Sequence, residues 1–395
     1  MYRRTNNTGL LFQYARVPTP PGVRYFDAPN QRYAMPNLKI QIKSGPPPHS
    51  KGTTLMQYRR LGNSNLKVSA LCLGTMMFGD QTELAEATRI VASAHEHGIN
   101  FIDTADVYSK GRSEEMVGKV LAGERHHWVL ATKVGNSMTV GKAAAQRDPL
   151  HYSRKWILQE VNNCLKRLGT DYIDILYLHR DFHDLNLEEV VRTLGDLIRS
   201  GKIRSFGLSN FSGWRIGEVM RWCGLLGVAQ PVVCQPYYNL LKRGPEVEIL
   251  PVCAYHGIGV VPYSPIARGV LTGKYPPGQQ PAADSRAGRG DKRMLDTEFH
   301  EDSLLIAQQV KTLAEARGIT PGQLATAWVL ANPIISSVIA GPRTLAQLED
   351  YYPAVDVVIS AQEEMFVDGL VTPGHTSTAG YNDPNYPFFG RPVAK

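Results

Sequence analysis

Four ionisable side chains in this sequence have types and spacing that suit proton transfer. Asp103, Lys133 and His179 each follow a short apolar segment, and Tyr108 stands five positions after Asp103. A phenol has an ordinary pKa of about 10, and a nearby ammonium group favours the phenolate and lowers that value. An aspartate beside the lysine would hold the ammonium group charged and in place. Together the four residues predict a tyrosine proton donor whose pKa is lowered by Lys133.

Each of these residues also has an ordinary structural explanation. An aspartate after a strand is usually a turn or helix-cap residue, a lysine there is usually solvated, and a single histidine is more often structural than catalytic. A hydrolase in which Asp103 and Asp106 act as paired acids is a further alternative. That alternative leaves Lys133 and His179 without a role, so the proton-donor hypothesis is favoured.

The elements that must position these residues alternate regularly from Met56 onward. Helical patterns lie at 82–97, with Thr82 as N-cap, and at 154–168 and 187–200, each followed by glycine. Eight βα units without a break in composition predict an α/β protein with a single (β/α)8 TIM barrel, whose strand ends form the active-site face. The candidate strands are residues 70–74, 99–102, 128–132, 173–178, 203–207, 231–235, 258–262 and 336–339.

Three segments of the predicted barrel domain, residues 56–395, lie outside this repeat. Residues 57–60 and 67–69 flank a turn and predict an N-terminal β-hairpin. Tyr275–Arg293 is rich in proline, glycine and charge, and predicts a long loop on the active-site side. From about residue 362 the chain predicts a C-terminal extension, which either packs against the barrel or covers the pocket only when it is occupied.

Residues 1–55 form an N-terminal extension rich in proline, asparagine and glycine, without a sustained period. They are predicted to be disordered, or else to be non-native sequence upstream of a natural start at Met56. They contain eight lysines or arginines and one acid, which accounts for the whole net charge of +7. The rest of the chain is balanced, so no nucleic-acid partner is expected.

The amino-acid composition argues for a large core and against several other classes of protein. The hydrophobic content of 43% supports a large core, and without a run of about 18 apolar residues no membrane partner is expected. Five scattered cysteines show neither a paired pattern nor a metal-binding spacing, which predicts reduced thiols, a cytoplasmic protein and no metal site. The oligomeric state is left open.

The motifs around these residues resemble those of the aldo-keto reductase family, in the family's order and over about residues 56–351. The resemblance implies a catalytic tetrad of Asp103, Tyr108, Lys133 and His179. It implies NADPH-dependent reduction of an aldehyde or ketone to an alcohol, with Tyr108 as proton donor, His179 orienting a small carbonyl or alcohol substrate, and no metal. The motifs are Asp103-Thr104-Ala105-Asp106-Val107-Tyr108, Ala131-Thr132-Lys133, Tyr177-Leu178-His179-Arg180 and Gly207-Leu208-Ser209-Asn210-Phe211.

A Rossmann domain is not supported, because no GxGxxG motif follows a strand near the N-terminus. The resemblance instead implies that barrel loops hold NADP(H), with Ser209, Asn210 and Gln235 on the nicotinamide carboxamide and the Tyr263 ring stacked on the nicotinamide. The implied cofactor-binding residues are Thr75, Met76, Ser209, Asn210, Gln235, Tyr263, Ser264, Pro265, Ile266, Arg268, Gly269, Lys274, Arg286, Gly341, Arg343, Gln347 and Asp350.

The segment after the last strand predicts the choice of coenzyme. Gly341 followed by a helix N-terminus indicates an anion site made of free N–H groups. Arg343 at that position suits a 2′-phosphate, because a guanidinium binds phosphate in bidentate geometry. NADP(H) is therefore predicted over NAD(H). Asp350 and Tyr351 stand where the family usually has glutamate and asparagine, which leaves the adenine contacts open.

Two further stretches resemble one branch of the family. Residues 74–79 and 264–274 are similar to bacterial aldo/keto reductases and to potassium-channel beta subunits. Members of that branch include proteins that keep the fold and the cofactor and serve partly as binding proteins. A cofactor-binding regulatory subunit is therefore the alternative to an enzyme, and the complete tetrad favours the enzyme.

Overall fold

Residues 56–136, 152–380, 383 and 386 are described by the computed structural model. The chain divides into two compact units, Met1–Lys43 and Ser44–Lys395, and every described residue belongs to the second. The predictions for residues 1–55 therefore lie outside the described residues. In the described part of the chain, no helix is both long enough and apolar enough to cross a membrane.

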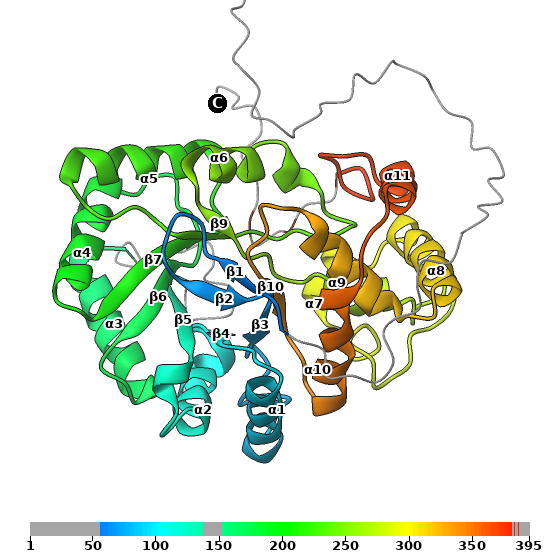
Figure 1. Ribbon diagram of the computed structural model, residues 1–395, viewed down its shortest axis with the longest axis horizontal. Helices are drawn as coiled ribbons and strands as arrows, with labels where there is room; N and C mark the ends of the chain where they lie inside the picture. The colour runs from blue at the N-terminus through cyan, green and yellow to red at the C-terminus, as the bar shows by residue number, and fades with distance from the viewer. Residues whose placement is uncertain (1–55, 137–151, 381–382, 384–385, 387–395) are drawn as a thin grey trace, which may run out of the picture. The chain divides into compact units, whose positions relative to one another are not determined.

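Eight parallel strands form the predicted (β/α)8 barrel (Figure 1). They neighbour one another in the order β10-β3-β4-β5-β6-β7-β8-β9, and the ring closes where Ile335 pairs with Val260. All eight strands predicted from the sequence are confirmed. Their bounds are β3 Leu71–Gly74, β4 Phe101–Asp103, β5 Val129–Val134, β6 Ile173–Leu178, β7 Ile203–Ser209, β8 Val233–Gln235, β9 Gly259–Val260 and β10 Val338–Ala340.

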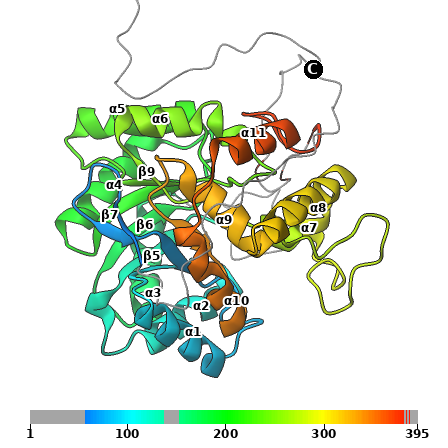
Figure 2. The ribbon, with the colours of Figure 1, turned by 45° about the vertical axis from the view of Figure 1, so that its right-hand side comes forward.

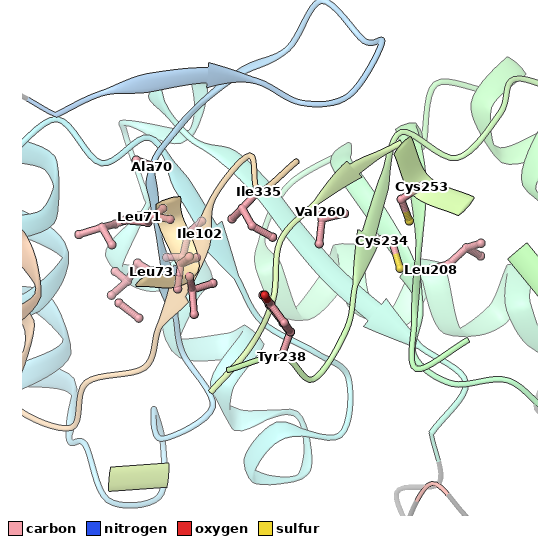
Figure 3. Close-up of a cluster of buried hydrophobic side chains, with 14 of the residues drawn as sticks. Ala70, Leu71, Leu73, Ile102, Leu208, Cys234, Tyr238, Cys253, Val260 and Ile335 are labelled. Atoms are coloured by element: carbon pink, nitrogen blue, oxygen red, sulfur yellow. The ribbon is translucent and has the colours of Figure 1, made fainter. Parts of the chain in front are cut away.

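Side chains along the strands alternate between the barrel interior and the layer beneath the helices. Figure 3 shows part of the outer cluster, with Leu71 from β3 and Ile102 from β4 among its members. Phe101, next to Ile102, belongs instead to the inner cluster, together with Tyr177. The same alternation places Asp103, two positions after Phe101, on the inner face where β4 ends.

Helices surround the strand ring in Figure 1, and α8 lies beside α9 in Figures 1 and 2. The helices predicted at 154–168 and 187–200 are confirmed as α3 and α4. The helix bounds are α1 Leu84–Glu96, α2 Arg112–Val120, α3 Arg154–Leu168, α4 Leu187–Arg199, α5 Gly213–Leu226, α6 Ile249–His256, α7 Lys292–Thr297, α8 Glu301–Ala316, α9 Pro321–Ala331, α10 Leu345–Tyr351 and α11 Ala361–Leu370.

The predicted glycine follows the end of α3, whereas the predicted N-cap of α1 is wrong. Gly169 ends α3 with a left-handed φ of 61°, which glycine adopts without a steric penalty. Thr82 does not cap α1, because Glu83 occupies the N-cap position. The Thr82 hydroxyl instead donates to the carbonyl oxygen of Arg343 at 2.9 Å. This bond ties the loop after β3 to the loop after β10.

The predicted hairpin is confirmed, with β1 Tyr58–Arg60 and β2 Lys67–Ser69 paired antiparallel. Leu61 and Val68 join the inner cluster of the barrel. The Arg59 guanidinium donates to the carbonyl oxygens of Leu330 and Ile335 at 2.9 Å each. The hairpin therefore closes the end of the barrel at which the strands begin, and the opposite end is left for the site.

The long loop and the C-terminal extension lie outside the ring. Residues 275–291 contain no strand or α-helix before α7 begins, and Figure 2 shows this loop extending beyond α7 and α8. In the extension, the backbone N–H of Ser377 donates to Leu241 at 2.9 Å, and that of Arg243 donates to His375 at 2.9 Å. The described part of the extension therefore packs against the segment that follows β8, as predicted.

Candidate active site

A cavity of about 600 Å³ lies at the carboxyl ends of the barrel strands. It brings together every residue that the sequence predicted for the site except Lys133, which is fully buried beneath it. The predicted residues that line the cavity are Thr75, Met76, Asp103, Tyr108, His179, Ser209, Asn210, Gln235, Tyr263, Ser264, Pro265, Ile266, Arg268, Gly269, Lys274, Arg286, Gly341, Arg343, Gln347 and Asp350.

The Lys133 ammonium group bonds to three neighbouring groups beneath the cavity. It forms a short ion pair with the Asp103 carboxylate. It also donates to the carbonyl oxygen of Thr104 at 2.9 Å and to the Tyr108 hydroxyl at 3.1 Å. The second carboxylate oxygen of Asp103 accepts a bond from the Gln235 amide at 2.9 Å. All three hydrogen-bonding directions of the ammonium group are thus used.

The segment that carries Tyr108 is a strained turn. Ser109, Lys110 and Gly111 follow it with φ values of 49°, 58° and 87°. A left-handed backbone costs a non-glycine residue about 1–2 kcal/mol, so surrounding contacts must hold this turn. One of them is the Ser109 hydroxyl, which donates to the carbonyl oxygen of Phe78 at 2.9 Å.

The pKa of Tyr108 differs from the sequence prediction. Burial raises it above its ordinary value, and this outweighs the lowering by Lys133. The negative charge of Asp103 also raises it and offsets part of the lowering by Lys133. The predicted net lowering is therefore wrong, although Lys133 acts in the predicted direction. Burial lowers the pKa of Lys133, but Asp103 and Tyr108 more than offset this, so the lysine stays protonated.

His179 is held as a neutral imidazole beside Tyr108. The two rings meet edge to face with centroids 5.9 Å apart. Burial, and then the charges of Lys133, Arg293 and Arg180, hold the pKa of His179 well below its ordinary value. A neutral imidazole carries one N–H donor and one acceptor nitrogen. The ring can therefore donate one hydrogen bond to an oxygen atom in the cavity.

Ser209, Asn210 and Gln235 lie together, but their polar groups already bond within the protein. The Ser209 hydroxyl donates to Gln235 O at 2.9 Å, and the Asn210 amide donates to His179 O at 2.9 Å. The Asn210 side-chain oxygen accepts from the Tyr263 hydroxyl at 2.9 Å. These bonds fix the three side chains at the cavity wall.

The aromatic side chain of Tyr263 lines the cavity. Its ring stacks on that of Tyr237, with the centroids 5.3 Å apart and the planes inclined by 14°. The stacked pair and the bond to Asn210 leave little freedom to the Tyr263 ring. A fixed aromatic ring that lines a cavity suits a flat ring of a ligand.

The Arg268 side chain bonds to other buried residues of the protein. Its guanidinium forms a buried ion pair with Glu298 and donates to the Thr297 hydroxyl at 3.0 Å. Ala267, Arg268 and Gly269 all have left-handed backbone, with φ of 48°, 52° and 96°. Arg268 therefore lines the cavity, but its charge already has a partner.

Several cations surround the outer part of the cavity. Arg286 is paired with Asp291 at 2.7 Å. Arg289 and Arg343 share the side-chain oxygen of Gln81, at 3.2 and 3.4 Å, and neither is paired with a carboxylate in the described part of the chain. Burial lowers the pKa of Arg343, and the charges of Arg289 and Arg286 lower it further. This mutual repulsion fits a site for a phosphate-bearing group.

The N-terminus of α10 differs from the prediction. The N–H of Arg343 donates to the Gln347 side-chain oxygen at 2.9 Å, and that of Leu345 donates to the Glu86 carboxylate at 2.6 Å. The prediction of free N–H groups is therefore wrong for these two residues. Glu86, from α1, already supplies the negative charge that a helix N-terminus favours.

The Asp350 carboxylate accepts hydrogen bonds from the start of another helix, α9. It accepts them from the Thr320 hydroxyl at 3.0 Å and the Gln323 amide at 3.1 Å. It still lines the cavity, as does its neighbour Tyr351.

Asp106 does not line this cavity, and its buried carboxylate oxygens have no hydrogen-bond partner among the described residues. That placement contradicts the alternative of a hydrolase with paired Asp103 and Asp106.

Some cavity residues were not predicted. Arg289 and Arg293 belong to the predicted long loop, whose many arginines were a usable signal. Gln81 and Asn136 lie in loops with no distinctive pattern. Tyr386, in the aromatic C-terminal extension, lines the cavity from a distant part of the chain. The other unpredicted lining residues are Gly74, Met77, Val107, Thr272, Gly322, Ile339 and Ala346.

Comparison with known proteins gives a consistent result. The family model described as "Aldo/keto reductase family" matches residues 70–371. A "Probable voltage-gated potassium channel subunit beta" of Arabidopsis thaliana is 38% identical over 310 residues, which cover 77% of this chain and 92% of the relative. The "Uncharacterized oxidoreductase YrpG" of Bacillus subtilis is 35% identical over 340 residues, 82% of this chain and 99% of the relative. The "Versiconal hemiacetal acetate reductase" of Aspergillus parasiticus is 31% identical over 339 residues, 80% and 98% respectively.

Proposed function

The chain belongs to the aldo/keto reductase family, and from that membership we propose that it is an NADPH-dependent oxidoreductase that reduces an aldehyde or ketone to an alcohol. The observation that carries the proposal is the buried Lys133, which bonds both Asp103 and Tyr108 beneath the cavity. A buried lysine is costly unless its charge is paired. Here its position serves the Tyr108 hydroxyl, which lines the cavity and can donate a proton to a bound carbonyl oxygen.

The chemistry divides between the coenzyme and the protein. When bound, the reduced nicotinamide supplies the hydride that the carbonyl carbon accepts. The Tyr108 hydroxyl donates a proton to the carbonyl oxygen, which becomes the alcohol hydroxyl, and Lys133 stabilises the phenolate that remains. Asp103 holds Lys133 in place, and the neutral His179 ring donates a hydrogen bond that orients the carbonyl oxygen.

The arginines at the outer part of the cavity support NADP(H) as the coenzyme. Arg289 and Arg343 repel each other and share one neutral acceptor, Gln81. A 2′-phosphate would relieve this repulsion with charge-assisted bonds, whereas the hydroxyl of NAD(H) would not. The Tyr263 ring, which lines the cavity, would hold the nicotinamide ring.

A regulatory role is the second candidate, and similarity to a named potassium channel subunit supports it. That name describes the relative, and this chain could combine a binding role with catalysis. The bonded group of Asp103, Lys133 and Tyr108 supports the enzyme. Co-purification with a membrane protein, without turnover of simple aldehydes, would favour the regulatory role.

Turnover by the purified full chain tests the proposal. We expect the absorbance of NADPH to fall when 4-nitrobenzaldehyde is added, and to fall more slowly with NADH at the same concentration. A panel of aldehydes and ketones would then rank the substrates. Binding of NADPH without its consumption by any member of the panel would contradict the proposed enzyme and leave the regulatory alternative.

A further inference from the structure

Arg180 is a cation without a counterion next to the catalytic histidine. It directly follows His179, and its charge helps to lower the pKa of that ring. Its buried Nε has no hydrogen-bond partner, and no carboxylate forms an ion pair with its guanidinium among the described residues. The residue as a whole is half-buried, so only the Nε atom is a buried donor without a partner in the described part of the chain, and such a donor calls for an explanation.

Arg180 does not itself line the cavity, and its guanidinium lies against the rings of Phe182 and Tyr386, of which Tyr386 does. Its central carbon is 4.8 Å from the Phe182 ring centroid and 5.4 Å from that of Tyr386, a residue that lines the cavity. Arg293 approaches the same Tyr386 ring at 5.3 Å. Two guanidinium groups thus contact one ring at the wall of the site. Such cation–π contacts are weak at about 0.5–2 kcal/mol and do not neutralise a charge.

The charges near the tetrad do not balance. Lys133 is paired with Asp103. Arg293 is paired with Asp383 of the C-terminal extension at 2.5 Å. Of the three cations whose charges lower the pKa of His179, Arg180 alone has no acid partner among the described residues. A cavity with an excess of one charge sign raises the local concentration of ligands of the opposite sign.

We propose that the carbonyl substrate carries a carboxylate group, which Arg180 and Arg293 attract beside the Tyr386 ring. This proposal rests on the proposed reductase function and names its substrate class. Carboxylates bind guanidinium groups through charge-assisted and often bidentate hydrogen bonds. Neutral aldehydes of the same size would be reduced, but with lower kcat/KM.

Two rigid aldehydes of similar size separate the charge from the carbonyl chemistry. The probes are 4-carboxybenzaldehyde, which is anionic at neutral pH, and the neutral 4-nitrobenzaldehyde, each measured at saturating NADPH. The nitro group activates the carbonyl carbon more than the carboxylate does, so the decisive quantity is the change in each kcat/KM between the wild type and a variant. Arg180→Met, which keeps an apolar chain against Phe182 and Tyr386, should lower kcat/KM for 4-carboxybenzaldehyde about ten- to a hundredfold. The value for 4-nitrobenzaldehyde should change less than about threefold.

Three further variants make the result specific. Arg180→Lys keeps the charge and should retain part of the preference. Asp383→Asn removes the acid that pairs with Arg293 and should increase the preference. Arg204→Met is the control, because Arg204 also stacks on an aromatic ring, Tyr172 at 4.8 Å, but lies at the start of β7, at the opposite end of the barrel.

Salt gives a test that does not depend on the folding of any variant. Added salt screens charge, so it should lower kcat/KM for 4-carboxybenzaldehyde in the wild type and leave that for 4-nitrobenzaldehyde nearly unchanged. Equal proportional losses for the two aldehydes in Arg180→Met, or equal effects of salt on the two, would overturn the carboxylate proposal while the reductase function stood. If neither aldehyde were reduced, the reductase function would fail and the carboxylate proposal with it.

Discussion

At the scale of single residues, Tyr108 shows how two effects on one pKa compete. Burial raises the pKa of the phenol, the Lys133 charge lowers it, and the Asp103 charge offsets part of that lowering. The tyrosine therefore stays protonated throughout the physiological pH range, as a proton donor requires. Lys133 acts chiefly after the proton has left, because an ammonium group at 3.1 Å from the hydroxyl stabilises the phenolate.

Arg343 belongs to the same scale and decides the predicted choice of coenzyme. Only NADP(H) has a 2′-phosphate to bond its guanidinium, and a charge-assisted hydrogen bond contributes roughly 1.5–3 kcal/mol. Arg343→Ala should therefore weaken NADPH binding about ten- to a hundredfold and leave NADH binding nearly unchanged. Fluorescence titration with both coenzymes measures this, with Arg192→Ala on α4 as the control. Equal losses for the two coenzymes would assign Arg343 to another part of the ligand or to the fold.

Asp106 predicts a pH dependence of stability. Burial, and then the charges of Glu114 and Glu160, raise its pKa well above the ordinary value. From about pH 4 upward the folded state therefore holds a proton that the unfolded state releases, and the free energy of unfolding falls as pH rises. Asp106→Asn removes this loss, so the variant should gain stability relative to the wild type as pH increases.

Urea unfolding at several pH values between about 5 and 8 measures the difference. Asp171→Asn, which replaces an exposed acid, is the control and should show no trend. A constant difference between Asp106→Asn and the wild type across this range would mean that Asp106 titrates alike in the folded and unfolded states.

At the scale of elements, the sequence predicted the strands and the residues at their ends. An apolar segment that stops at an ionisable residue indicates both a buried strand and the face to which its end belongs. The partners of single side chains were not predictable in this way. Glu86 caps α10 from α1, and Glu298 pairs with Arg268 across the fold. Such pairs join residues distant in sequence, and no local pattern encodes them.

Gly62, in the turn of the hairpin, provides a prediction about stability. Gly62 has a left-handed φ of 55°, and a Cβ at this position would lie 2.5 Å from the backbone nitrogen of Gly259. Backbone strain and overpacking against β9 should make Gly62→Ala less stable by roughly 2–4 kcal/mol. Gly224→Ala, where the added Cβ has no neighbour within 4 Å, should be neutral or slightly stabilising. Denaturant unfolding of both variants gives the comparison, and equal stability would show that the hairpin shifts freely to admit the methyl group.

At the scale of the molecule, the hairpin closes one end of the barrel and the cavity lies at the other. The hairpin fills the end where the strands begin, and loops from distant parts of the chain surround the opposite end. Among them, Tyr386 reaches the cavity from the C-terminal extension, which composition alone did not place there. The five cysteines are all buried free thiols, away from the cavity lining. The redox chemistry of the proposed reaction thus depends on the coenzyme and not on a thiol.

The central claim, that Tyr108 donates the proton in an NADPH-dependent reduction, is tested most directly by Tyr108→Phe. Aldehyde turnover, NADPH affinity and thermal stability are measured for the variant and for Tyr58→Phe, a control in the hairpin. General acid catalysis contributes typically about 10²–10⁴-fold. We therefore predict that Tyr108→Phe loses kcat by about that factor, while NADPH affinity and stability remain close to those of the wild type. Wild-type kcat in a folded Tyr108→Phe that binds NADPH would contradict the account.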